Sequence, residues 1–340
     1  MADHHEAAAD DRDNFMFVYT GGRVPEHLRL HITHARVDES VTEIDDEAFA
    51  RCHRLLDVDC HNGVERVNER AFYLCRSLRR ANLPGVTFID QSAFGYCSRL
   101  MDVKFSSRLV TIERWAFDEC EDLKYLKMPS LLRIKFGAFF SCKTLAEAEF
   151  GEGLETIEEG AFQYCHSLRR IAIPLKYDLF TPLNSNERYD QFDDCFKLAT
   201  VELVGSIHKT ISFLSLQNWR NEMNQEISRI NEVLPNLSTF EKAGEMRDWI
   251  RRVLRRIEHY KAEHSNLLKE AMVLLELAVW KAKLRQNEEE KHSVLDSNKA
   301  KKIKLDLESA RHGHRVTCGA DIIIKNVLPF LELPKGDDDS

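Results

Sequence analysis

The sequence predicts an α/β solenoid of short stacked coils, followed by a C-terminal α-helical region. Three observations predict this fold. A nine-residue word, EAFARCHRL at its first occurrence from Glu47, returns five more times at an almost constant interval. The residues after each copy alternate between apolar and polar, as in a strand with one buried face. Beyond Val204 the composition changes to one rich in helix formers.

The repeated word places Phe and Cys at fixed positions. Its six Phe are separated by 23, 22, 23, 22 and 23 residues, and a weaker copy, QFDDCFKL, follows thirty residues after the sixth. A period of this length is typical of solenoids, because no single coil can bury its apolar side alone. We therefore expect an interior row of Phe and another of Cys. The Phe are Phe49, Phe72, Phe94, Phe117, Phe139, Phe162 and Phe192. The Cys, three residues after each, are Cys52, Cys75, Cys97, Cys120, Cys142, Cys165 and Cys195.

Each coil, within residues 44–204, is expected to hold one short parallel β-strand and one short helical segment. The strand follows the pattern L-x-x-h-x-h, where h is apolar, as in LKYLKMP from Leu123. The helical segment carries Ala-Phe and Cys, and acidic residues such as Asp90 and Glu113 precede the word. Acidic side chains favour the start of a helix, where backbone amides are unpaired and the helix dipole is positive.

Residues 15–43 are expected to cap the first coil. The stretch ITHARVDESVTEI from Ile32 follows the strand-and-return pattern without a preceding Ala-Phe word, and FMFVYTGG from Phe15 predicts an edge strand and a turn. Residues 1–14 predict a disordered acidic tail, which lacks the basic-then-apolar order of a secretory signal.

The repeat resembles the BspA-type leucine-rich repeat, whose pattern runs L-x-x-I-x-L-P, L-x-x-I and A-F-x-x-C-x-x-L. The likeness covers roughly residues 28 to 204 and is best from Leu154 to Pro174. The tail stretches HYKAEH, WKAKL and KNVLPFL are similar to those of intracellular diatom-type members. The resemblance implies a curved right-handed leucine-rich-repeat solenoid with strands on its concave side and a role in protein binding. It implies no biochemical activity.

The polar positions of L-x-x-h-x-h are expected to face solvent on the concave side. Two interpretations stay open: a partner-docking surface, or a ladder of cross-strand charge pairs that keeps the face soluble. Tyr125 is the aromatic residue of this set, and aromatic residues often dominate binding energy. The set comprises Asp57, Asp59, Arg80, Asn82, Asp102, Lys104, Tyr125, Lys127, Glu147, Glu149, Arg170, Thr200 and Glu202.

The row of cysteines also has two interpretations. Neighbouring coils lie about 4.8 Å apart, which is within the Cα separation of a disulfide. The row is then either a redox or metal-binding array, or a set of free thiols that pack as small apolar side chains. Packing is favoured, because buried thiols lack the electropositive surroundings that stabilise a thiolate. Cys318 with His312 and His314 is a separate, weak candidate for a metal cluster.

Residues 205–285 predict a helical region. A stripe from Met246 to Ala278 has apolar steps of alternately four and three residues, the heptad pattern of a coiled coil. The helix over residues 242–285 is either continuous or broken near Ser265, and residues 242–285 are a candidate for self-association. Residues 286–316 predict a charged flexible segment, 317–333 a packing helix that encloses the second half of the stripe, and 334–340 an acidic tail.

The composition narrows the function. The net charge of −8 argues against nucleic-acid or membrane-surface binding, and no apolar run of 18 residues exists. Neither a P-loop, nor HExxH, nor a nucleophile elbow is present, which indicates a non-enzymatic protein without a cofactor. The sequence favours an intracellular, cytoplasmic interaction module for an unknown protein partner. A structural homo-oligomer is the alternative, and a thiol-redox or metal-binding protein is a remote one.

A nuclear location is an alternative for the same module. The stretch NKAKKIK contains Lys301, Lys302 and Lys304 and matches a nuclear-import signal. Short basic runs also arise by chance in charged segments, so both interpretations stay open.

Overall fold

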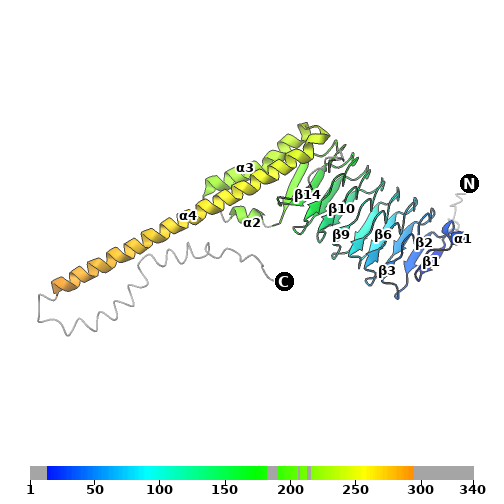
Figure 1. The fold of residues 1–340 in the computed structure, drawn as a ribbon, viewed down its shortest axis with the longest axis horizontal. Helices are drawn as coiled ribbons and strands as arrows, with labels where there is room; N and C mark the ends of the chain where they lie inside the picture. The colour runs from blue at the N-terminus through cyan, green and yellow to red at the C-terminus, as the bar shows by residue number, and fades with distance from the viewer. Residues whose placement is uncertain (1–13, 182–189, 206, 213–215, 294–340) are drawn as a thin grey trace, which may run out of the picture. The chain divides into compact units, whose positions relative to one another are not determined.

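The computed structural model describes residues 14–181, 190–205, 207–212 and 216–293 (Figure 1). The chain divides into two compact units, one of residues 1–211 and 216–258 and the other of residues 212–215 and 259–340. The first unit contains the solenoid and the helices that close its C-terminal end.

Parallel strands build the solenoid, and a repeating coil contributes two of them where the sequence predicted one. The longer strands are β1 (Met16–Tyr19), β2 (His34–Val37), β4 (Asp57–Asp59), β6 (Arg80–Leu83), β8 (Asp102–Phe105), β10 (Tyr125–Met128), β12 (Glu147–Phe150), β14 (Arg170–Pro174) and β15 (Thr200–Val204). The shorter strands are β3 (Glu43–Ile44), β5 (Arg66–Val67), β7 (Phe88–Ile89), β9 (Thr111–Ile112), β11 (Arg133–Ile134) and β13 (Thr156–Ile157).

The longer and shorter strands form separate sheets. The shorter strands make one six-stranded sheet in the order β13-β11-β9-β7-β5-β3. The longer strands make a five-stranded sheet, β1-β2-β4-β6-β8, and a four-stranded sheet, β10-β12-β14-β15. The ladder of longer strands is therefore interrupted between β8 and β10, while the ladder of shorter strands continues past that point.

The Ala-Phe segment is a pair of turns, so the predicted short helix is wrong. In the first coil the amides of Ala48 and Ala50 donate to carbonyls three residues back, while the amide of Phe49 donates across to Ala71 at 2.7 Å. Successive amides thus donate alternately to a carbonyl of their own coil and to a carbonyl of the next coil. In an α-helix, all of these amides would donate to carbonyls within the helix. In the six full copies of the word, the residues two before and two after Phe adopt left-handed backbone conformations, as at Glu47 and Arg51 with φ of 55° and 63°.

The Phe and Cys rows lie in the interior. All seven Phe and all seven Cys are fully buried. Successive Phe rings stack nearly parallel, with centroids 5.0–5.6 Å apart. Each inner ring therefore has both of its faces covered by its neighbours, and burial of this row supplies much of the driving force for stacking the coils.

The N-terminal end is closed by a strand and a short helix. Strand β1 pairs in parallel with β2 and adds an edge to the longer-strand sheet, and α1 (Glu26–Arg29) follows the turn after β1. The Tyr19 ring lies 5.0 Å from Phe49, the first ring of the stack, and its hydroxyl donates to Asp45 at 3.0 Å. Tyr19 thus covers the end of the apolar row and satisfies its own polar group.

Helices follow the last strand. They are α2 (Ile207–Ser212), α3 (Gln217–Val233), the 3₁₀ turn η2 (Leu234–Asn236) and α4 (Thr239–Ser293). A capping box begins α4: the Ser238 amide and hydroxyl both donate to the Glu241 carboxylate, at 3.1 and 2.6 Å. Of the two alternatives left by the sequence, the structure has the continuous helix, without a break near Ser265.

Polar side chains of α3 and α4 satisfy the backbone of the last coil. The Asn231 side-chain amide accepts from the Val201 amide at 2.7 Å and donates to the Val201 carbonyl at 3.2 Å. The fully buried Lys242 donates to the carbonyls of Cys195, Phe196 and Leu198. These groups stand where a further coil would place its own backbone, so they satisfy polar backbone groups that the end of the array would otherwise leave unpaired.

Candidate functional site

The predicted polar positions lie in two columns across the longer strands, here named the long-strand face. One column aligns Asp57, Arg80 and Asp102 in β4, β6 and β8, then Tyr125, Glu147, Arg170 and Thr200 in β10, β12, β14 and β15. The other aligns Asp59, Asn82 and Lys104, then Lys127, Glu149 and Glu202, with Ala172 between the last two. All thirteen predicted residues are exposed or half-buried, whereas Ala172 is buried.

Two residues of the face lie outside the prediction. His34 and Arg36 of β2 pair with Asp57 and Asp59 and extend both columns toward the N-terminus. His34 lies 3.0 Å from the Asp57 carboxylate. The signal was present in the sequence, because HARV of β2 has the same alternation as the later strands.

Cross-strand pairs connect most of the charged groups on this face. Arg80 contacts Asp57 at 2.5 Å, and the Asn82 amide donates to Asp59 at 2.6 Å. Arg170 donates to Glu202 at 2.7 Å through Nε and lies 3.7 Å from Glu147. The hydrogen bond from Arg170 lowers the pKa of the Glu202 carboxyl.

Tyr125 differs from the paired charges around it. Its side chain is 62% exposed at the N-terminal edge of the four-stranded sheet, next to the interruption between β8 and β10. Lys127, two residues on, contacts Glu149 at 3.4 Å and is itself largely exposed. The face therefore combines a nearly self-neutralised ladder with one exposed aromatic ring.

The cysteines of the described residues are all free and buried. Six of the seven in the row donate a hydrogen bond to the carbonyl of the Phe in the preceding coil, as Cys75 does to Phe49 at 3.0 Å and Cys165 to Phe139 at 3.2 Å. Burial raises the pKa of the Cys52 and Cys60 thiols to about 12 and that of Cys75 well above its usual value. The thiol therefore acts as a buried donor, and no metal-binding group of His, Cys, Asp or Glu occurs in the described ranges.

An aromatic row along the turns was missed in the sequence. The variable positions of the repeated word carry Tyr73, Tyr96, Trp115, Phe140 and Tyr164, and neighbouring rings meet edge to face at 5.1–5.5 Å. Four of these rings, with charged neighbours, line a hollow of about 390 Å³, here named the turn-edge hollow. Its lining residues are Arg70, Tyr73, Ser92, Tyr96, Trp115, Asp118, Glu119 and Phe140.

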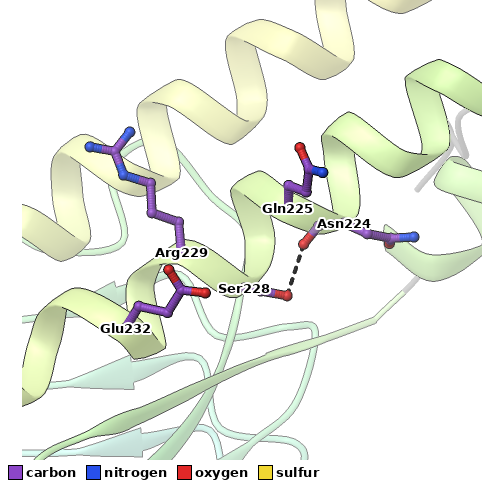
Figure 2. A pocket seen from close by; sticks show the side chains of 5 residues that line it. All are labelled: Asn224, Gln225, Ser228, Arg229 and Glu232. Atoms are coloured by element: carbon purple, nitrogen blue, oxygen red, sulfur yellow. Dashed lines mark hydrogen bonds between the residues drawn. The ribbon is translucent and has the colours of Figure 1, made fainter.

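A second hollow, of about 430 Å³, lies on α3 (Figure 2). It is lined by Asn224, Gln225, Ser228, Arg229 and Glu232. All five come from one helix, and the Ser228 hydroxyl donates back to the Asn224 carbonyl at 2.9 Å. Since no second element contributes a side chain, the arrangement offers no convergent polar groups for chemistry.

The predicted heptad stripe has different surroundings in its two halves. Met246, Ile250, Val253 and Ile257 are buried in the first unit. In the second unit, apolar side chains of α4 are 44–67% exposed. They are Leu267, Met272, Val273, Leu274, Leu277, Val279, Trp280 and Leu284. The segment expected to cover them, residues 317–333, lies outside the described residues.

Further predictions also fall outside the described residues. They concern residues 1–13 of the acidic tail, the charged segment beyond residue 293, the acidic residues 334–340, the basic residues Lys301, Lys302 and Lys304, and the candidate ligands Cys318, His312 and His314. Within the described ranges, no helix has the length and apolarity that a membrane span requires.

The repeats identify the family. A family model for the BspA type leucine rich repeat region matches in six copies, over residues 28–133, 71–195 and 125–218, which together span more than half of the chain. The chain belongs to this family. The BspA-type repeat thus accounts for the solenoid and for its interior rows, and no curated protein matches the chain.

Solved structures of leucine-rich-repeat proteins resemble the chain at low identity. A leucine-rich repeat protein of T. pallidum is 21% identical, with a TM-score of 0.39, over 62% of this chain and 92% of that one. A leucine-rich cell surface protein of Faecalibacterium prausnitzii is 22% identical, with a TM-score of 0.27, over 54% and 62% of the two chains. A leucine-rich repeat protein of Eubacterium ventriosum is 13% identical, with a TM-score of 0.30, over 52% and 74%.

Leucine-rich-repeat proteins generally mediate protein–protein interaction, and their solenoid is typically a non-enzymatic scaffold. In the described part of this BspA-type chain, the polar groups on the long-strand face bond mainly to one another.

Proposed function

We propose that the chain is a non-enzymatic protein–protein interaction module whose partner docks on the long-strand face. The observation that supports this is the pair of solvated columns, held in register by parallel strands, with Tyr125 exposed among them. A rigid sheet presents its side chains at fixed spacing, so a partner meets a preorganised surface with little ordering cost.

The charges on the face indicate what kind of partner it suits. The thirteen residues include six carboxylates and four cationic side chains, so the face carries little net field for long-range steering. Affinity is then expected to depend on Tyr125 and on complementary polar contacts, with a modest dependence on salt.

The test is capture of a partner by immobilised full-length chain, with variants matched in surface exposure. Tyr125→Ala should reduce capture, because it removes the exposed ring of the face. Phe240→Ala is the control, since Phe240 is 67% exposed on α4 and lies outside the face. Equal capture by both variants and the parent would place the partner site elsewhere. Arg170→Glu is a poor probe, because it sets a third carboxylate beside Glu147 and Glu202.

A structural homo-oligomer is the second candidate. The exposed apolar side chains of α4 from Leu267 to Leu284 favour it, since such a stripe is stabilised when a second helix covers it. The molecular mass of the full chain should then depend on concentration. A chain of residues 1–266 keeps Asn231 and Lys242 in place and should remain monomeric. A full chain that stays monomeric at all concentrations argues against this candidate.

We propose an intracellular location. Eight free cysteines in the described residues support it, because closely spaced thiols persist unpaired most readily in a reducing compartment. Deleting residues 301–304 in a fluorescent fusion tests whether the basic run directs nuclear import. A nuclear signal that the deletion abolishes supports import, and an unchanged distribution supports a chance run.

A further inference from the structure

The side chains that line the turn-edge hollow are different from those of the long-strand face. Its aromatic residues sit on four successive coils at the variable positions of the repeated word, Tyr73, Tyr96, Trp115 and Phe140. The Tyr73 and Tyr96 rings meet at 80° with centroids 5.5 Å apart, and the Trp115 and Phe140 rings meet at 71° and 5.1 Å. Edge-to-face contacts of this kind hold neighbouring rings in a fixed mutual orientation along the hollow.

Backbone geometry holds the largest of these rings in place. Trp115 occupies a left-handed position with φ of 58°, two residues before Phe117. Its indole lies directly over Gly137 of the next coil, where an added Cβ would come within 2.6 Å of the ring. Because Gly137 has no side chain, the indole of Trp115 fills the space beside it. This contact with the next coil fixes the position of the ring.

Two carboxylates line the same hollow. Asp118 and Glu119 follow Phe117 directly, and both are only partly accessible. Among the described residues, no side chain donates a hydrogen bond to either carboxylate or forms an ion pair with it. This contrasts with the long-strand face, where carboxylates such as Asp57 and Glu202 have cationic partners within 2.5 Å.

The aromatic rings of this edge already accept cationic groups from their own chain. The Arg70 guanidinium carbon lies 6.0 Å from the centre of the Tyr73 ring, and that of Arg114 lies 5.0 Å from the Phe136 ring. Arg70 also contacts Glu69 at 3.2 Å. In the hollow, Asp118 and Glu119 outnumber the single guanidinium of Arg70, so the lining carries one negative charge in excess when both carboxyls are ionised.

We propose that the turn-edge hollow binds an organic cation, with aromatic side chains around its apolar part and Asp118 and Glu119 beside its charge. An ammonium or guanidinium group is attracted to the faces of Trp and Tyr rings, and nearby carboxylates add a direct charge interaction. A lysine side chain of a partner and a free quaternary ammonium compound share this chemistry. The site shares no residue with the proposed docking face. A negative result for one proposal therefore leaves the other untouched.

The experiment titrates the full chain at about pH 8, where carboxylates are ionised, with three probes followed by calorimetry and ligand-observed NMR. Two probes carry the cation: N-acetyl-lysine methylamide and tetramethylammonium chloride. The third, N-acetyl-norleucine methylamide, keeps an aliphatic side chain without the charge. We expect a cationic probe to bind at least about tenfold more tightly than the neutral one.

Three variants locate the site. The double variant Asp118→Asn with Glu119→Gln keeps the shape of the hollow and should weaken cation binding about tenfold. Trp115→Leu should weaken it by a similar factor, and a melting curve verifies that each variant is folded. Glu65→Gln removes an exposed carboxylate that does not line the hollow and should leave binding unchanged.

The possible outcomes distinguish the two sources of the cation from a failure of the proposal. Tighter binding of the lysine probe assigns the hollow to a partner's side chain, and tighter binding of tetramethylammonium assigns it to a free small cation. Saturable binding of neither cation overturns the proposal. Equal binding of the norleucine probe, or unchanged binding by the folded double variant, also overturns it.

Discussion

The Lys242 ammonium lies 2.7 Å from the carbonyl oxygen of Leu198 and 3.2 Å from those of Cys195 and Phe196. A fully buried lysine thus replaces the amides of a coil that the chain does not have. Lys242→Met keeps the aliphatic stem and leaves three carbonyls without their donor. We expect the free energy of unfolding to fall by about 2–4 kcal/mol in a denaturant titration.

The control for that prediction is Lys261→Met, on the exposed surface of the same helix. It should change the free energy of unfolding by less than about 0.5 kcal/mol. Similar losses in the two variants would contradict the capping role of Lys242.

The middle of the Phe stack should be the most sensitive core position. Phe117 is stacked between Phe94 and Phe139 at 5.1 and 5.4 Å, and Phe105 contacts it edge-on. Phe117→Ala opens a cavity among rings that the backbone holds apart, so it should reduce the free energy of unfolding by about 3–5 kcal/mol. A loss under about 1 kcal/mol in denaturant melts would refute this packing.

The raised pKa of the Asp118 carboxyl predicts that the stability of the fold depends on pH. Burial, and then the charge of Glu119, raises the pKa of this carboxyl to about 7, whereas an unfolded Asp has a pKa of about 3.9. The folded state therefore binds the proton more tightly, and stability from this group falls as the pH rises from about 4 through 7. Asp118→Asn should be more stable than the parent by about 1–3 kcal/mol at pH 8 and equal to it at pH 4, in thermal or denaturant melts. A difference that does not vary with pH would contradict this assignment.

Gly137 and Gly244 provide a matched pair. Gly137 has a φ of 61°, and a Cβ there would lie 2.6 Å from the Trp115 ring. Gly137→Ala should therefore destabilise the fold by about 1–3 kcal/mol. Gly244 lies in α4 with no heavy atom within 4 Å of the added Cβ, so Gly244→Ala should stabilise it by about 0.5–1 kcal/mol. Equal effects of the two substitutions would count against the turn geometry.

The buried thiols should react only when the protein unfolds. In a Cys318→Ser variant, the eight described cysteines are the remaining thiols of the chain. Their burial disfavours the thiolate, which is the reactive form. An aromatic disulfide reagent should modify them at the rate of unfolding, and denaturant should make all eight react quickly. A rapid phase in native protein would favour the redox or metal-binding alternative.

The longer strands and their register could be predicted from the sequence because the period is nearly constant. Asp57, Arg80 and Asp102 are separated by 23 and 22 residues, and equal positions in stacked coils must lie side by side. The turns could not be predicted in the same way. Acidic residues before Phe suggested helix starts, but the backbone amides there bond alternately to the next coil, which a single coil's sequence does not reveal.

The closing residues and the turn-edge hollow were missed for different reasons. Lys242 bonds to carbonyls 44 to 47 residues away, and a lysine on a helix is usually taken as solvated. The Ser238 and Glu241 box was the available signal, since it starts the helix just before Lys242. The aromatic residues of the hollow occupy variable positions of the word, which a search for repeated residues passes over.

The alternating turn bonds have a consequence for changes in chain length. Each coil presents the same donors forward and the same Phe carbonyl to the next thiol, so adjacent coils are interchangeable at their interfaces. Removing residues 94–116 joins Ala93 to Phe117 and sets the Phe117 ring against Phe72. Insertion or loss of whole coils therefore preserves the contacts between coils. The length of this protein is therefore expected to vary by whole coils, and each coil gained or lost lengthens or shortens the exposed faces of the solenoid by one strand.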